Sequence, residues 1–174
     1  MLKFHEIKNC IIGLGYVGLP LAVEFGKKYN VLGFDSNRKR VEELKKKIDC
    51  NDEINKKEFA LSKKLNISYN LKNLKDCNVF IVTVPTPITK KNKPDLSFIR
   101  KACLDISLFI KNKDVVIFES TVYPGLTEEF CIPLIEKNSK LKLNLDFFCG
   151  YSPERINPND KKHKLTNIIK KITG

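Results

Sequence analysis

Short apolar runs alternate along the chain with stretches in which apolar residues recur at steps of three and four. The runs, such as CIIG, VLGF and VFIV, are rich in β-branched residues and show no polar alternation. Such runs predict strands buried on both faces of a sheet, whereas steps such as Val41, Leu44 and Ile48 predict amphipathic helices. The expected strands lie at residues 10–13, 31–35, 66–70, 79–85, 114–121 and 145–154 (with its exit loop), and the expected helices at residues 18–29, 38–48, 73–77 (a single turn), 98–110 and 124–137.

The order of these elements decides the fold class. Strands joined by helices throughout indicate a mostly parallel sheet covered on both faces. We therefore expect an α/β fold: one Rossmann-like, doubly wound sheet of about six strands with helices on both faces, over residues 1–174. Ser36 or Asn37 is expected to cap the second helix, and Asp95 or Ser97 the helix at 98–110. Residues 49–65 are polar, with only weak helical spacing.

Composition narrows the classes of partner. The chain carries a net charge of +12, which favours anionic ligands, but 28 of its 32 basic residues are lysines spread along its whole length. It also has sixteen asparagines, so a Lys- and Asn-rich proteome would give the same balance. No basic stretch is interleaved with aromatic residues, so no nucleic-acid partner is expected. No apolar run approaches the ~20 residues of a membrane span and no signal peptide is visible, so we expect a cytoplasmic protein with no membrane partner.

The cysteines suggest neither a metal site nor a nucleophile. They are widely scattered, no pair has C-x-x-C spacing, and the chain has only two histidines. A zinc site is therefore not expected, and we predict no metal ligands. We expect reduced, mostly buried thiols. The six positions are Cys10, Cys50, Cys77, Cys103, Cys131 and Cys149.

Three glycines follow the first strand in the spacing G-x-G-x-x-G and open the first helix. In this context Gly13 permits the tight turn, Gly15 lets the backbone approach a pyrophosphate, and Gly18 lets the helix pack closely on the strand. Asp35, at the end of the second strand, can accept hydrogen bonds from an adenosine ribose and would repel a 2′-phosphate, which favours NAD over NADP. Arg38 and Arg40 keep NADP as an alternative cofactor, since a nearby arginine favours the binding of a 2′-phosphate. A structural turn without phosphate is the other alternative.

Three further loops leave the carboxyl ends of strands, where ligands collect in such sheets. TVPTP, residues 83–87, is a rigid loop at the carboxyl end of the fourth expected strand. It forms either one wall of a cofactor-binding cleft or a plain turn. ESTVYPG, residues 119–125, offers the hydroxyls of Ser120 and Thr121, which otherwise cap the next helix. GYSPERINP, residues 150–158, places Glu154 either as an acid, base or orienting group or as an ion-pair partner of Arg155.

Four ordered motifs, GLGYVGLPLA, VTVPTP followed by KPDLS, ESTVYPG and YSPERINP, together carry a family resemblance. The chain resembles, over essentially all 174 residues, the N-terminal NAD-binding domain of the UDP-glucose/GDP-mannose dehydrogenase family. The form of the last motif is most similar to the bacterial UDP-N-acetyl-hexosamine 6-dehydrogenases. The resemblance implies oxidation of the C6 alcohol of a UDP-sugar to the uronic acid with two NAD⁺. It also implies a full-length homodimer with a central helix and a second, nucleotide-sugar-binding domain.

The resemblance also assigns roles to residues. Asp35 is implied to bind the adenosine ribose, with Arg40 near the adenosine end, and Thr121 is implied to order a water with Glu154 at the reaction centre. Pro158 stands where the glucose-specific branch has a second acidic residue, which argues against simple UDP-glucose specificity, and Leu126 departs from the small or hydroxyl residue usual after YPG. The implied cofactor residues are Gly13, Gly15, Tyr16, Val17, Gly18, Asp35, Arg40, Thr83, Pro85, Thr86 and Thr121; the catalytic pair is Thr121 and Glu154; and the substrate residues are Glu154, Arg155, Ile156 and Asn157.

The family's covalent step uses a cysteine in a Gly-rich G-G-x-C context, and none of the six cysteines stands in such a context. Hydride transfer from an aldehyde needs a hydrate or a thiohemiacetal, and the thiol supplies the latter. We therefore expect a truncated chain, without the central helix and substrate domain, that is inactive alone. The alternatives are a non-catalytic, stand-alone nucleotide-binding module and a Rossmann dehydrogenase of the hydroxyacid type. The VPTP and YSPERINP loops are evidence against a dehydrogenase of the hydroxyacid type.

Overall fold

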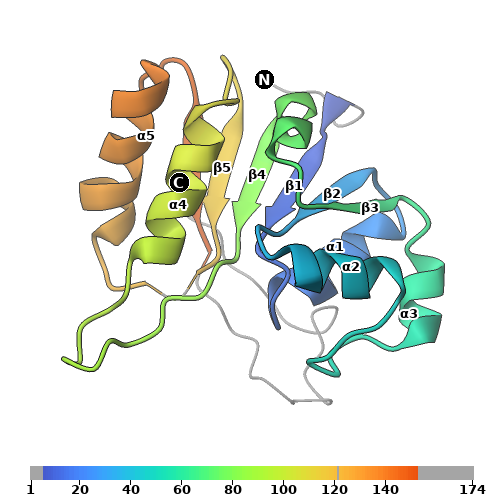
Figure 1. The fold of residues 1–174 in the computed structure, drawn as a ribbon. Coiled ribbons are helices and arrows are strands. Elements are labelled where there is room, and N and C mark those ends of the chain that lie inside the picture. Colours follow the sequence, from blue (N-terminus) through green and yellow to red (C-terminus); the bar gives the residue numbers. More distant parts are fainter. Residues whose placement is uncertain (1–5, 121, 153–174) are drawn as a thin grey trace.

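A parallel sheet forms the centre of the computed structural model, which describes residues 6–120 and 122–152 (Figure 1). Six strands of this part of the chain pair in the order β3-β2-β1-β4-β5-β6, and every pairing is parallel. The winding reverses between β1 and β4, which creates a switch point where ligands collect outside the carboxyl ends of the strands. The strands are β1 (Asn9–Ile12), β2 (Val31–Phe34), β3 (Leu65–Ser68), β4 (Val79–Val82), β5 (Val115–Phe118) and β6 (Phe148–Tyr151).

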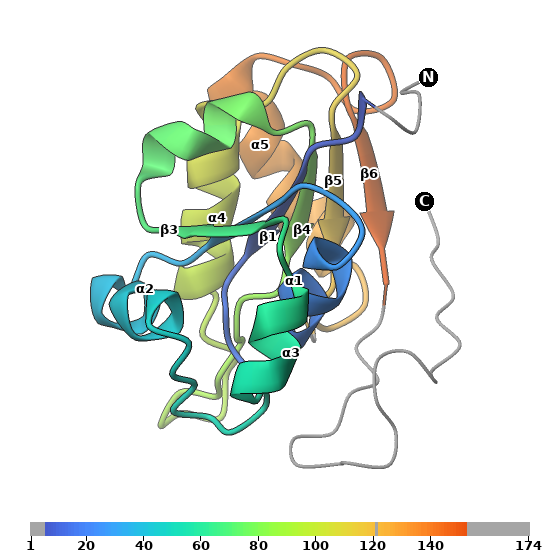
Figure 2. The same cartoon turned by 90° about the vertical axis from the view of Figure 1, so that its right-hand side faces the viewer.

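Helices cover both faces of the sheet, so the predicted doubly wound Rossmann-like fold is confirmed. One buried cluster packs the side chains of α4 and α5 against Cys10, Phe80 and Phe118, and the other packs α1 and α3 against Ile11 and Ile81. Figure 2 shows α4 and α5 side by side on one face of the strands. The helical elements are α1 (Gly18–Gly26), α2 (Arg38–Lys45), α3 (Lys56–Leu61), the 3₁₀ turn η2 (Leu71–Asp76), α4 (Ser97–Ser107), the π turn η3 (Thr127–Cys131) and α5 (Ile132–Ser139).

Side-chain caps set the beginnings of α2 and α3. Asn37 accepts a hydrogen bond from the backbone N–H of Arg40, as expected of a cap. Asn55 and Glu58 form a reciprocal capping box at the start of α3. This box lies in the polar segment where the sequence showed only weak helical spacing. A short helix is therefore defined there by its cap rather than by its apolar pattern.

The helix expected at residues 124–137 is divided into two elements, and the reason is a proline. Pro133 has no N–H to donate to the carbonyl of Glu129 in an α-helical register. The chain accordingly forms the π turn η3 before it enters α5 at Ile132. None of the helices in the described part of the chain has both the length and the apolarity needed to cross a membrane.

Asp114 lies buried at the amino end of β5, on the opposite edge of the sheet from the switch point. Burial raises the pKa of its carboxyl to about 6, although the backbone N–H of Lys111 donates to the carboxylate at 2.8 Å and opposes the shift. The folded pKa exceeds that of the unfolded chain, so the contribution of this group to stability falls as the pH rises from about 4 to about 6.

We expect Asp114→Asn to stabilise the chain at pH 7 by about 1–2 kcal/mol, because the amide keeps the acceptor for Lys111 without a buried charge. The gain should be much smaller at pH 3.5, where the wild-type carboxyl is neutral in the folded state and mostly neutral in the unfolded state. Urea unfolding at the two pH values measures this difference. Asp76→Asn, at an exposed position, is the control for the change in net charge. A gain that is the same at both pH values would contradict the assignment.

Candidate functional site

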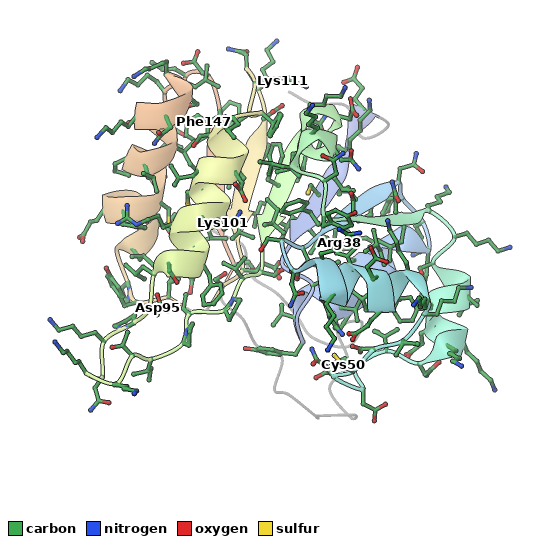
Figure 3. All side chains as sticks on the ribbon, in the orientation of Figure 1. Arg38, Cys50, Asp95, Lys101, Lys111 and Phe147 are labelled. Atoms are coloured by element: carbon green, nitrogen blue, oxygen red, sulfur yellow. The ribbon has the colours of Figure 1, made fainter. Side chains whose placement is uncertain are left out.

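A cavity of about 680 Å³ opens at the switch point, at the carboxyl ends of the strands. The strands point toward this edge in Figure 1, and the long β4–α4 loop extends from it. In Figure 3 Cys50 and Asp95 lie at this edge, whereas Lys111 and Phe147 lie at the opposite one. The lining residues come from the glycine turn, the loop after α2, the β4 exit with the arm that follows it, and the β5 exit: Gly15, Tyr16, Val17, Asn51, Thr83, Val84, Pro85, Thr86, Pro87, Ile88, Pro94, Leu96, Glu119, Ser120, Val122, Tyr123 and Leu126.

The turn between β1 and α1 is held by backbone contacts to β2. Gly13 has φ +96°, a conformation that favours glycine, and its N–H donates to the carbonyl of Phe34 at 2.8 Å. The N–H of Leu14 donates to Oδ2 of Asp35 at 2.8 Å. The glycine turn and the end of β2 therefore form one hydrogen-bonded unit.

Gly15 and Gly18 are required for different physical reasons. A Cβ on Gly18 would lie 1.9 Å from the carbonyl oxygen of Gly13 and 2.4 Å from Oγ1 of Thr83, so this glycine lets α1 approach the sheet. A Cβ on Gly15 would meet no heavy atom of the described residues within 4 Å, and Gly15 lines the cavity. Space is thus left open above the turn, where a ligand can approach the backbone closely.

The amino end of α1 faces this open space without a side-chain cap. Val17 is the N-cap residue, no side chain among the described residues caps the helix, and its first turn contains no acidic residue. The N–H of Leu19 is already bound to the carbonyl of Gly15 at 3.0 Å and Pro20 has no N–H, so it is the positive end of the helix dipole that favours an anionic ligand. The residues present fit the pyrophosphate of a dinucleotide.

Asp35 is half-buried just past the carboxyl end of β2. Oδ2 accepts from Leu14 and Oδ1 accepts from the N–H of Asn37 at 2.8 Å, so both carboxylate oxygens anchor backbone. Each carboxylate oxygen has two acceptor sites, which leaves capacity for the hydroxyls of a ribose. The position agrees with the predicted ribose-binding role, and that role stays a prediction.

The two arginines that left NADP open have different environments. Arg38 is exposed, ion-pairs with Glu42 at 3.4 Å and lies over the ring of Tyr69, 5.3 Å from its centroid. Arg40 is buried and ion-pairs with Asp49 at 2.7 Å. Arg40 was expected near the adenosine end of the cofactor; in the structure its guanidinium is engaged by protein groups.

Thr83 and Ser120 connect the loops around the cavity. Oγ1 of Thr83 donates to the carbonyl of Gly13 at 2.7 Å, which fixes the β4 exit to the glycine turn. Oγ of Ser120 donates to the carbonyl of Val84 at 2.7 Å, so it joins the β4 and β5 exits instead of capping a helix. Pro85 and Thr86 line the cavity as expected of a cofactor wall. Their proposed contact with a nicotinamide stays a prediction.

Several predicted residues lie outside the part of the chain that the structure describes. These are the catalytic pair Thr121 and Glu154 and the remaining substrate residues Arg155, Ile156 and Asn157. The neighbours of Thr121 are described, and Glu119 and Tyr123 both line the cavity. Thr121 therefore lies between two cavity-lining residues in sequence.

The sequence reasoning missed part of the wall. Residues 88–94 form an arm in which Ile88 and Pro94 pair as an isolated antiparallel bridge, and both line the cavity. Leu126, flagged only as unusual, is fully buried and also lines it. At the end of the arm Asp95 accepts from the N–H of Ser97, although the N-cap residue of α4 is Leu96. The KPDLS motif, which follows VPTP in the sequence, was the signal from which this part of the cavity wall could have been predicted.

None of the six cysteines lines the cavity. All six cysteines are free. Burial raises the pKa of Cys10 and brings that of Cys149 to about 12, and a hydrogen bond to Cys131 together with burial raises the pKa of Cys103. The pKa of Cys77 is lowered by its hydrogen bond with Cys10, against the effect of burial. No group of three metal-binding side chains was found within residues 6–120 and 122–152.

Comparisons with known proteins identify relatives of this chain. Residues 7–174 match the model of the UDP-glucose/GDP-mannose dehydrogenase family, NAD binding domain. The chain is 54% identical over 169 residues to the UDP-N-acetyl-D-glucosamine 6-dehydrogenase of Pseudomonas aeruginosa, with 97% of this chain and 40% of that protein covered. It is 51% identical over 174 residues to the Salmonella typhi protein of the same name, with 100% and 41% covered.

The fold is similar to that of the UDP-D-ManNAc dehydrogenase from Pyrococcus horikoshii, with a TM-score of 0.80 and 32% sequence identity. That likeness covers 87% of this chain and 37% of the other. The chain thus spans about two fifths of the length of the curated relatives named above.

Proposed function

The chain belongs to the UDP-glucose/GDP-mannose dehydrogenase family as its NAD-binding domain, and from this premise we propose that it holds NAD⁺ while the C6 alcohol of a UDP-N-acetyl-hexosamine is oxidised to the uronic acid. One observation carries the proposal. The uncapped amino end of α1 and the open space above Gly15 lie beside Asp35, the acidic residue just past the end of β2 that binds the N–H of Leu14. The anionic pyrophosphate suits the positive amino end of α1. The adenosine ribose, which comes next in the dinucleotide, suits the acceptor oxygens of Asp35.

The charges around Asp35, where the adenosine ribose is proposed to bind, favour NAD⁺ over NADP⁺. A 2′-phosphate would approach the carboxylate of Asp35, and Arg40 is paired with Asp49 and buried. Arg38 is the exposed arginine, and it is engaged with Glu42 and Tyr69. We therefore infer that NADP⁺ binds more weakly than NAD⁺.

The chemistry requires two hydride transfers, since conversion of an alcohol to a carboxylate removes four electrons. Bound NAD⁺ supplies the hydride acceptor. We propose that Thr121 and Glu154 order a water at the reaction centre, and that Glu154, Arg155, Ile156 and Asn157 contact the sugar. The named relatives act on UDP-N-acetyl-D-glucosamine, and Pro158 argues against simple UDP-glucose specificity, so we propose a UDP-N-acetyl-hexosamine as the substrate.

The second oxidation sets a limit on what this chain does alone. An aldehyde must first become a hydrate or a thiohemiacetal before it loses a hydride. None of the six cysteines lines the cavity, and the one thiol whose pKa is lowered, Cys77, is buried just before the amino end of β4, at the opposite edge of the sheet. We propose that the nucleophilic thiol is provided by a segment outside these 174 residues. The six free cysteines are consistent with the reducing cytoplasm, where we propose that the protein works.

Isothermal titration tests the binding proposal directly. We expect this chain to bind NAD⁺ and to bind NADP⁺ at least about tenfold more weakly, the effect of one unfavourable charge contact. Equal affinities would overturn the assignment of Asp35, and no heat with millimolar NAD⁺ would overturn cofactor binding by this chain. Incubation with NAD⁺ and UDP-N-acetylglucosamine should yield no uronic acid, and its steady formation with two NADH per sugar would overturn the proposal that the nucleophile lies elsewhere.

A further inference from the structure

Glu119 is the one charged residue among the described residues that line the cavity at the switch point. It is buried there, with 6% of its surface exposed. The chain carries a net charge of +12, and the cofactor proposed for the cavity is an anion, so neither explains an acidic residue at this place. A carboxylate in the wall of a cavity disfavours the phosphate groups of a ligand and favours a cationic part of it.

Glu119 continues the pairing of β5 with β4 by one residue at the carboxyl edge of the sheet. Its N–H donates to the carbonyl of Val82 at 2.8 Å. Along β5, Phe118 packs in the cluster with α4 and α5, whereas Ile117 packs against the cluster on the other face with α1. Because side chains alternate along a strand, Glu119 belongs to the face that α1 covers. It therefore shares a face with the helix whose amino end opens to the cavity.

The order of the strands decides which end of the dinucleotide would meet Glu119. Asp35 follows β2 and the glycine turn follows β1, so the adenosine ribose and the pyrophosphate are proposed to lie at these two strands. The nicotinamide half must then extend in the opposite direction, toward β4 and β5. The cavity continues that way, since Thr86, Glu119 and Tyr123 line it. Glu119 therefore lies at the nicotinamide end of the proposed site.

The nicotinamide ring is the part of the cofactor whose charge changes during the reaction. The ring is cationic in NAD⁺ and neutral in NADH, whereas the two phosphates keep their charges. A carboxylate near the ring attracts the oxidised form and has no such attraction for the reduced form. A partly enclosed cavity strengthens this difference, because charges interact more strongly there than in water. Glu119 can therefore distinguish two redox states of a ligand that are nearly equal in size.

We propose that Glu119 weakens the binding of NADH relative to NAD⁺ and so promotes the exchange of cofactor between the two oxidation steps. This inference rests on the proposed function, in which one site accepts two hydrides in succession. After the first hydride transfer the ring beside Glu119 has lost its positive charge, and the complex loses their attraction. Release of NADH and binding of a second NAD⁺ are favoured as a result.

The experiment is isothermal titration of the wild-type chain and Glu119→Gln with NAD⁺, NADH and ADP-ribose. We expect the ratio of the dissociation constant of NADH to that of NAD⁺ to fall about tenfold in Glu119→Gln, the effect of one charge pair in a partly enclosed site. A tenfold change in this ratio equals about 30 mV in the two-electron potential of the bound cofactor. ADP-ribose lacks the nicotinamide, so it should bind the variant as tightly as wild type or more tightly, because a negative charge has been removed.

Glu128→Gln is the matched control, since it makes the same change in charge nine residues later. Glu128 is exposed and is not among the residues that line the cavity, so this variant should keep the ratio within about twofold of wild type. Glu119→Asp retains the charge and should retain most of the ratio. If circular dichroism shows that Glu119→Gln does not fold, Glu119→Ala removes the same charge and carries the comparison.

The three ligands separate failure of this inference from failure of the proposed function. If NAD⁺ binds and the ratio is the same in Glu119→Gln as in wild type, the inference is overturned and the proposed function stands. An equal loss of affinity for NAD⁺, NADH and ADP-ribose also overturns the inference, because Glu119 would then support the shape of the cavity without responding to the charge of the ring. If the wild-type chain binds none of the three ligands, the proposed function is overturned and this inference with it.

Discussion

Gly18→Ala is expected to destabilise the chain by about 3 kcal/mol or more, at the upper end of the cost of overpacking a tight contact. The new Cβ would lie 1.9 Å from the carbonyl oxygen of Gly13, which belongs to the backbone and cannot rotate away. The nearest side-chain atom, Oγ1 of Thr83 at 2.4 Å, is itself bound to that carbonyl. Helix α1 would have to move off the sheet to make room.

Urea unfolding followed by circular dichroism measures this cost. A loss of about 3 kcal/mol corresponds to a drop in melting temperature of roughly 6–12 °C for a chain of this length. The better helix propensity of alanine is worth at most about 1 kcal/mol at this first position of α1, so it offsets only part of the clash. Gly15→Ala is the matched control, since it adds the same methyl group in the same turn. Equal stability of Gly18→Ala and wild type would show that α1 does not pack as closely as the structure places it.

The sequence was sufficient for features whose cause is local. The spacing of Gly13, Gly15 and Gly18 predicts the turn because the positive φ of Gly13 and the close approach of Gly18 to the Gly13 carbonyl are set within a few residues. The order of strands and helices predicts the parallel sheet because βαβ connections permit few arrangements. Asn37 was predicted as a cap and accepts the expected hydrogen bond. In each case the deciding interactions join residues close in sequence.

Other parts of the site depend on contacts that no local pattern encodes. Arg40 was expected at the cofactor, but its partner Asp49 lies in a segment with weak periodicity, so the ion pair has no sequence signature. Thr83 was expected to line the cofactor slot. Thr83 lines the cavity, and its hydroxyl is also bound to the carbonyl of Gly13, 70 residues away. Prediction from sequence fails here because the partner of a polar side chain is chosen by the fold.

Gly15→Ala is expected to leave folding intact and weaken NAD⁺ binding about 100-fold or more, by displacing a charge-assisted contact worth roughly 3 kcal/mol. The added Cβ meets no heavy atom of the described residues within 4 Å, and the backbone of Gly15 shows no positive φ. Alanine is therefore tolerated and should cost less than about 0.5 kcal/mol of stability. The methyl group would project into the space that the pyrophosphate is proposed to occupy.

Together, Gly18→Ala and Gly15→Ala distinguish the contribution of this turn to stability from its contribution to NAD⁺ binding. Gly18→Ala should lower stability first, whereas Gly15→Ala should keep the wild-type unfolding curve and lose affinity in the titration. Unchanged affinity in Gly15→Ala would mean that the pyrophosphate does not approach this backbone, even if NAD⁺ binds elsewhere in the cavity. A large loss of stability would instead mean that the space above Gly15 is filled by the protein. The predicted pattern requires both an open position at Gly15 and a closed one at Gly18, three residues apart on the same turn.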